Sequence, residues 1–111
     1  MEVISSGEGR ELTLTLCGEL DHHGAKDAMQ RMELALDTAL PQRLVLDLSG
    51  ISFMDSSGIA VAMRAQKRMR ALGGSAVLRR VPPQAKKVFT AAGLFRIIPL
   101  EEESSNESQA K

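Results

Sequence analysis

The turn Asp55-Ser56-Ser57-Gly58 contains the residue types of this sequence that best suit chemistry. It follows the apolar run Leu44–Leu48, which predicts a buried strand, and precedes Ile59–Leu72, where apolar residues recur at helical spacing. Ser56 therefore stands at a helix start, where free backbone N–H groups and the positive end of the helix dipole suit an added phosphate. A serine that only caps the helix through its hydroxyl would have the same local sequence, so spacing alone leaves both interpretations open.

Two further chemistries would use the adjacent histidines His22 and His23. Together with Asp21 and Ser56 they supply the residue types of a hydrolytic triad, but the turn lacks the Gly-x-Ser-x-Gly pattern of a nucleophile elbow. The chain is also too short and too poor in aromatic residues for an evident substrate pocket. A metal site is disfavoured too, because adjacent histidines lack the i, i+4 spacing that directs two imidazoles at one ion.

Alternating strands and helices must position these residues. The Leu/Thr alternation of Glu11–Leu16 predicts a strand with one buried face, and Gly7-Glu8-Gly9 predicts the turn of a hairpin. The predicted strands cover residues 2–5, 11–16, 43–48 and 76–78, with a last strand or packed extended segment over residues 95–100. The predicted helices cover residues 25–39, 59–72 and 83–92, each ending near a proline or glycine.

This order predicts an α/β fold with a mixed, mostly parallel sheet of four to five strands and three to four helices. The N-terminal hairpin supplies an antiparallel edge, and the Ser56 turn lies at the carboxyl end of a central strand, where such folds place their sites. The predicted core faces of the helices are Ala25, Ala28, Met29, Met32, Leu36 and Ala39, then Val61, Ala62, Ala65, Met69 and Leu72, then Val88, Phe89 and Ala92.

Composition narrows the class of protein. Its 111 residues have zero formal net charge and no Trp or Tyr, which argues against nucleic-acid binding. No apolar run approaches a membrane span and no signal peptide is visible, so we expect one cytoplasmic domain that contacts neither nucleic acid nor membrane.

The single cysteine, Cys17, excludes an internal disulfide and is predicted to be buried and inert. Arg64, Lys67 and Arg68 predict a solvated basic face on the second helix, with a partner surface as the alternative.

Three separate motifs carry a resemblance to a known family: residues 52–59 (Ser-Phe-Met-Asp-Ser-Ser-Gly-Ile), residues 18–23 (Gly-Glu-Leu-Asp-His-His) and residues 93–98 (Gly-Leu-Phe-Arg-Ile-Ile). Together they resemble the anti-sigma factor antagonist (anti-anti-sigma) family of sulfate-transporter-and-antagonist (STAS) domains, and most of all its sporulation members. The resemblance implies a single STAS-like domain over residues 1–100. Residues 101–111 then form a polar acidic tail, either a short helix or disordered.

The resemblance also implies a function. Unphosphorylated members bind an anti-sigma factor serine kinase and release the sigma factor. Phosphorylation of the serine that matches Ser56 switches binding off, and a serine phosphatase restores it. We therefore expect no catalytic residues, no cofactor and no metal. The implied partner surface is Asp21, His22, Asp55, Ser56, Ser57, Gly58 and Ile59.

Alternatives to this expectation remain at the level of sequence. Within the family, the chain could serve a stress-response or other regulatory pathway with a different kinase. Outside it, a small serine hydrolase is the competing class. One position departs from the family pattern, since Ala60 stands where a second glycine is common. Alanine should firm the first turn of the helix and change how closely a partner backbone can approach.

Overall fold

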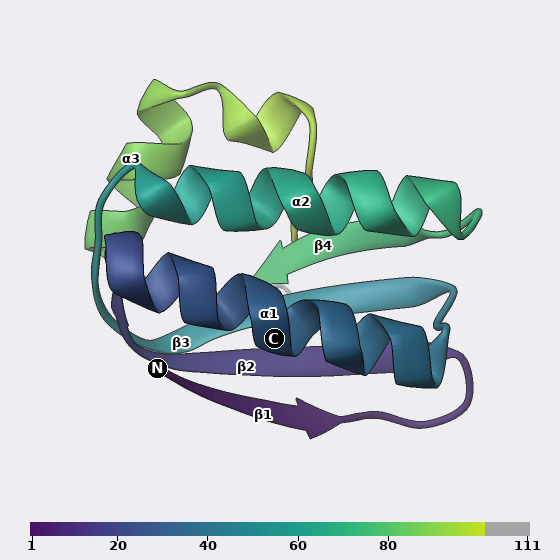
Figure 1. Ribbon diagram of the computed structural model, residues 1–111. Coiled ribbons are helices and arrows are strands. Elements are labelled where there is room, and N and C mark those ends of the chain that lie inside the picture. Colours follow the sequence, from purple (N-terminus) through teal and green to yellow (C-terminus); the bar gives the residue numbers. More distant parts are fainter. Residues whose placement is uncertain (102–111) are drawn as a thin grey trace, which may run out of the picture.

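The computed structural model describes residues 1–101. Within them, five strands form one sheet in the order β1-β2-β3-β4-β5 (Figure 1). The strands are β1 (Glu2–Ser6), β2 (Glu11–Leu20), β3 (Arg43–Met54), β4 (Ser75–Arg79) and β5 (Leu100–Glu101). β1 and β2 pair antiparallel, and the other neighbours pair parallel. The predicted α/β fold with an N-terminal hairpin is confirmed.

The helices among the described residues are α1 (His22–Ala39), α2 (Ser57–Ala71), α3 (Pro83–Ala91) and a short 3₁₀ helix, η1 (Leu94–Arg96). Figure 1 shows α1 and α2 side by side across one face of the sheet, with α3 and η1 beyond α2. Most of the predicted helix faces are buried in the core, but Met29, Leu72 and Val88 are half-buried and Ala39 and Ala92 are exposed. No described helix combines the length and hydropathy needed to cross a membrane.

The central strand is longer than predicted. We expected it to end at Leu48, where the continuous apolar run ends. Instead, β3 continues to Met54 and pairs with β2 as far as Leu20. The exposed Ser49 and Gly50 sit within a strand that its neighbour holds in place. The turn that carries Ser56 is therefore short and begins at Asp55.

The segment after α3 is less extended than predicted. Gly93 has a φ of +70° and reverses the chain, after which Leu94 and Ile98 are both buried. Their spacing of four residues belongs to a helical turn, and the ring of Phe95 packs edge-to-face on Phe89 at 5.9 Å between centroids. Within this segment only Leu100–Glu101 forms a strand, which pairs parallel with β4.

The structure contradicts the prediction for Cys17, and it does not describe most of the predicted tail. Cys17 is half-buried, not buried, because it lies on the sheet face opposite Leu16 and away from α1 and α2. Residues 102–111, on which the predicted acidic tail falls, lie outside the described residues, so the tail and its boundary stay predictions.

Candidate functional site

Two turns meet at one edge of the sheet. The last residues of β2 and β3, Leu20 and Met54, are register partners, so Asp21 and Asp55 leave the sheet at the same level. The Asp55 backbone N–H donates to the Leu20 carbonyl oxygen at 3.4 Å. This parallel pairing brings together two segments more than thirty residues apart, as expected at the carboxyl ends of neighbouring strands.

Ser56 occupies the N-cap position of α2 without capping it through its side chain. Its backbone is helical (φ −63°, ψ −14°), whereas a side-chain cap needs an extended backbone to reach the free N–H groups. The bond comes from Asp55, whose Oδ1 accepts from the Ser57 backbone N–H at 2.8 Å. The interpretation of Ser56 as a plain helix cap is therefore wrong. Ser56 is exposed, and its hydroxyl has no hydrogen-bond partner among the described residues.

Asp21 is the N-cap of α1 in the usual sense. Its backbone is extended (φ −92°, ψ −165°), and its Oδ1 accepts from the Gly24 backbone N–H at 2.8 Å. His22 and His23 are exposed at the start of α1, with their rings edge-to-face at 6.0 Å between centroids. No hydrogen bond between described residues joins either histidine to Ser56.

Glycine is required in both turns by close packing. A Cβ on Gly24 would lie 2.0 Å from the Glu19 carbonyl oxygen. A Cβ on Gly58 would lie 2.4 Å from the Met54 sulfur. Gly58 is thus buried beneath the turn, while its neighbours Ser57 and Ile59 are half-buried. Of the predicted partner surface, Ser56 and His22 are the most exposed members.

Gln84 of α3 supports the site and was missed by sequence reasoning. Its Oε1 accepts from the Met54 backbone N–H at 2.8 Å, and its Nε2 donates to the Met54 carbonyl oxygen at 2.7 Å. The amide thus mimics a neighbouring strand and fixes the residue just before Asp55. The only local signal was the helix start at Pro82-Pro83, which says nothing about where a side chain two residues later would bind.

Asp47 is the buried charge of the strand that leads to the site. Burial by itself would raise its pKa, but hydrogen bonds from the Ser49 backbone N–H (2.9 Å) and from Arg80 Nε (2.9 Å) outweigh this and lower it. Its pKa therefore lies below the ordinary value for an aspartate. Asp47 is fully buried, so it belongs to the scaffold and does not face a partner.

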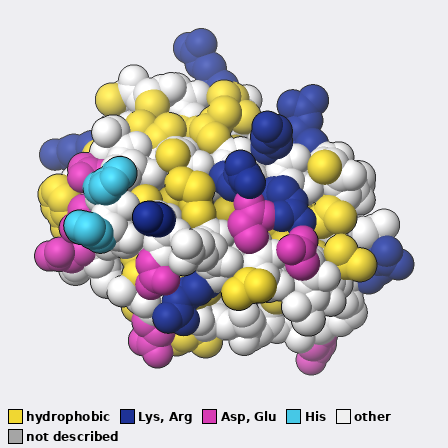
Figure 2. All heavy atoms as spheres, viewed as in Figure 1, with side chains coloured by type: hydrophobic (Ala, Val, Ile, Leu, Met, Phe, Trp, Pro, Cys, Tyr) yellow, Lys and Arg dark blue, Asp and Glu magenta, His cyan; other side chains and the backbone are white. Residues whose placement is uncertain are grey.

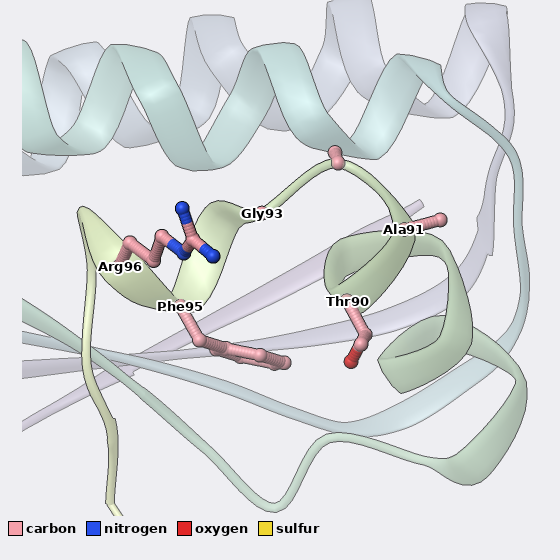
Figure 3. Close-up of a pocket in the computed structure, with 6 residues that line it drawn as sticks. Thr90, Ala91, Gly93, Phe95 and Arg96 are labelled. Atoms are coloured by element: carbon pink, nitrogen blue, oxygen red, sulfur yellow. The ribbon is translucent and has the colours of Figure 1, made fainter.

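Several hollows lie on the described surface, and two of them concern the start of α2 and the end of α3. One, of about 400 Å³, runs between the beginnings of α1 and α2 and is lined by His22 and Ser57 among others. Figure 2 shows hydrophobic side chains on this face beside the two histidines. The other, of about 600 Å³, lies between the end of α3 and η1, where the Phe95 ring is directed toward Thr90 (Figure 3). None of the predicted site residues line the second hollow.

The described residues hold no group of three or more His, Cys, Asp or Glu side chains placed to bind a metal ion.

Comparison with known proteins matches these features to one family. Residues 3–107 match the STAS domain. An anti-sigma F factor antagonist of Paenibacillus polymyxa is 33% identical over 95 residues, which cover 86% of this chain and 81% of that protein. The protein of the same description from Lysinibacillus sphaericus is 31% identical over 83 residues, covering 75% of this chain and 71% of that one.

Solved structures agree on the fold. The anti-sigma factor antagonist SpoIIAA in its unphosphorylated form superposes with a TM-score of 0.78, covering 96% of this chain and 91% of that one at 24% identity. A five-stranded mixed sheet with its two aspartate turns at one edge is thus a STAS domain. The chain belongs to the STAS-domain family and, within it, to the anti-sigma factor antagonist family.

Proposed function

We propose that the chain is an anti-sigma factor antagonist that is switched by phosphorylation of Ser56. The unphosphorylated form binds an anti-sigma factor that is also a serine kinase, and the sigma factor is released. The kinase transfers the γ-phosphoryl group of ATP to the Ser56 Oγ, which loses its proton, and ADP leaves. A serine phosphatase hydrolyses the phosphoserine and restores binding. The chain is then a cytoplasmic substrate and binding module with no catalysis of its own.

The state of the Ser56 hydroxyl carries this proposal. It is exposed, and it makes no capping bond because Asp55 supplies that bond to Ser57. A kinase can therefore modify it without breaking a contact that holds the turn. The relatives described as anti-sigma F factor antagonists support an anti-sigma factor as the partner.

The effect of the phosphate follows from its charge. It adds about −1.5 to −2 charges, which the N-terminus of α2 tolerates because the helix dipole is positive there. At an interface the same dianion, next to Asp55 in the chain, resists desolvation and repels acidic groups of a partner. We therefore expect phosphorylation to abolish binding while the fold is retained.

Phosphopeptide mapping tests the proposal. The chain is incubated with ATP and an anti-sigma factor kinase of the same organism, with Ser56→Ala and Ser57→Ala in parallel. A single phosphate on Ser56, absent from Ser56→Ala and present in Ser57→Ala, is the expected result. A phosphate on Ser57 would move the site, and none with an active kinase would refute the switch. Ser56→Asp should bind the kinase more weakly than Ser56→Ala.

The pathway and the competing class are tested separately. We infer a sigma factor of the sporulation type, with a stress-response sigma factor as the alternative, and the anti-sigma factor that binds with higher affinity decides between them. An activated-ester assay addresses the hydrolase class, for which turnover that depends on Ser56 would be required.

A further inference from the structure

The contact between α1 and α2 divides into two halves. In the carboxyl-terminal half, arginines of α2 form ion pairs with carboxylates of α1 across the surface. Arg64 Nε lies 2.5 Å from Glu33 Oε2, and Arg68 Nη2 lies 2.6 Å from Asp37 Oδ1. Arg68 pairs with Glu33 as well. Arg64 and Arg68 therefore pair across the two helices, contrary to the solvated basic face that we predicted, whereas Lys67 of that face is exposed.

In the amino-terminal half, the same contact opens into the groove of about 400 Å³. Ala25, Met29 and Ala60 give it an apolar lining, and Ser57 belongs to its wall. Ala25 and Ala60 are too small to fill the space between the helices. Because Ser57 lies in the wall, the groove begins next to Ser56. This apolar lining, next to an exposed serine, suits contact with one apolar side chain of a partner.

The rim of the groove carries a cation that is not paired by any acidic residue among 1–101. Lys26 lines the groove and makes no hydrogen bond or ion pair with any other described residue. Its helix neighbours contrast with it, since Asp27 pairs with Arg31 and Glu33 pairs with α2. The groove thus combines an apolar lining with a positive charge at its edge that the described residues leave unpaired.

We propose that this groove receives an apolar side chain of the anti-sigma factor, and that an acidic side chain beside it contacts Lys26. The inference rests on the proposed function and adds the chemistry of the partner segment. Charge complementarity selects an acidic neighbour, because Lys26 offers a positive charge that no residue among 1–101 pairs. It also fits the switch, since a phosphate on Ser56 at the mouth of the groove would repel that acidic group.

Filling the groove tests the apolar contact. Ala60→Leu places a larger side chain in the lining, and Ala71→Leu makes the same change at the exposed far end of α2. Binding of each unphosphorylated variant to the anti-sigma factor kinase is measured by titration calorimetry, with circular dichroism to verify the fold. We expect Ala60→Leu to weaken binding by about tenfold or more and Ala71→Leu by less than about twofold. Equal affinity for Ala60→Leu and wild type, or an equal loss in both variants, would overturn the proposal.

Reversing the rim charge tests the acidic neighbour. Lys26→Glu should slow association by about fivefold at low salt and flatten its salt dependence, as expected for a rim charge. Lys67→Glu, an exposed lysine on α2 with no ion pair in the described chain, is the matched control and should change little. Equal slowing in both variants would show a general effect of net charge and refute the contact.

The two proposals fail in distinguishable ways. If wild type binds the kinase and is phosphorylated on Ser56 while the groove variants behave like wild type, only the groove is refuted. If wild type binds no anti-sigma factor, the proposed function is refuted and the groove proposal with it.

Discussion

Two turns leave the same edge of the sheet with the same Asp-x-x-Gly pattern, at residues 21–24 before α1 and at residues 55–58 before α2. In both turns the aspartate accepts a hydrogen bond from a backbone N–H at the helix start. In both, a Cβ on the glycine would overlap the atoms beneath it. The shared pattern therefore holds a helix N-terminus close against the sheet.

The turns differ in where the cap falls. Asp21 is itself the N-cap and bonds the N–H three residues on, so His22 already belongs to α1. Asp55 precedes the N-cap and bonds the N–H two residues on, so Ser56 takes the cap position. A shift of one residue leaves the Ser56 hydroxyl without a capping bond and available for modification.

Adding a methyl group to the glycine of each turn should have the largest effect on the free energy of unfolding. In Gly24→Ala the Cβ meets the Glu19 carbonyl, which is backbone, while in Gly58→Ala it meets the Met54 side chain, which can rotate. We expect the free energy of unfolding to fall by about 3 kcal/mol in Gly24→Ala and by about 1 kcal/mol in Gly58→Ala, the latter partly offset by alanine's helix propensity. Urea denaturation measures both. Equal losses would show that the two turns are packed alike.

The sequence predicted the strands and helices that carry the two turns, but it did not show which residue caps α2. Alternating Leu12, Leu14 and Leu16 revealed the buried face of β2, and the strand–helix order placed Ser56 at a central strand. Spacing alone left open whether the Ser56 hydroxyl caps α2, because Ser and Asp are both common capping residues and only the backbone dihedrals and the bond to Ser57 separate them.

Other features had no local signal at all. The extension of β3 past Ser49 depends on pairing with β2, which a single strand's sequence does not reveal. The Gln84 bonds to Met54 span thirty residues, so only the folded chain brings the partners together. The groove likewise arises from small residues on two helices, Ala25 and Ala60, whose register no local pattern reports.

Removing the Gln84 amide tests whether the turn at residues 55–58 depends on side-chain hydrogen bonds to the residue before it, which the turn at residues 21–24 does not have within residues 1–101. Gln84→Ala leaves the Met54 N–H and carbonyl without their side-chain partner. We expect a loss of about 2 kcal/mol of stability together with weaker kinase binding, since the residue before Asp55 loosens. Gln66→Ala on α2, whose side chain makes no hydrogen bond in the described chain, is the matched control. Unchanged amide exchange at Met54 and Asp55 would contradict a positioning role.

Asp47, a buried aspartate outside both turns, makes a contact whose contribution to stability depends on its charge. Asp47→Asn removes the ion pair with Arg80, and we expect a loss of about 1 kcal/mol at neutral pH, reduced because the Arg80 side chain is half-exposed. Since its folded pKa is lowered, Asp47 stabilises fully above the unfolded value of about 3.9, and this contribution is lost as the pH falls through the folded pKa. Stability measured from neutral to acidic pH should decline less steeply in Asp47→Asn. An unchanged slope would contradict the ion pair.

At the two turns, stability should depend more on the hydrogen-bond acceptor atom of the aspartate than on its charge. Asp21→Ala and Asp55→Ala each remove a cap bond and should each cost about 1 kcal/mol, whereas the Asn variants keep an acceptor oxygen and should cost only a few tenths. Thermal melts of the four variants measure this. If Asp55→Ala is as stable as wild type, the bond to Ser57 does not cap α2, and the difference between the turns disappears.

Replacing Ser56 by alanine should have the smallest effect on stability and is the most direct test of the difference between the turns. Its hydroxyl bonds no described residue, so the free energy of unfolding should change by less than about 0.5 kcal/mol. A true N-cap serine would cost about 1 kcal/mol, the loss expected for Asp21→Ala, which serves as the reference in the same urea titrations. A loss of that size in Ser56→Ala would mean that the hydroxyl caps α2 in solution. Phosphorylation would then have to break a structural bond, and the switch would act partly through the stability of the turn instead of through the partner surface alone.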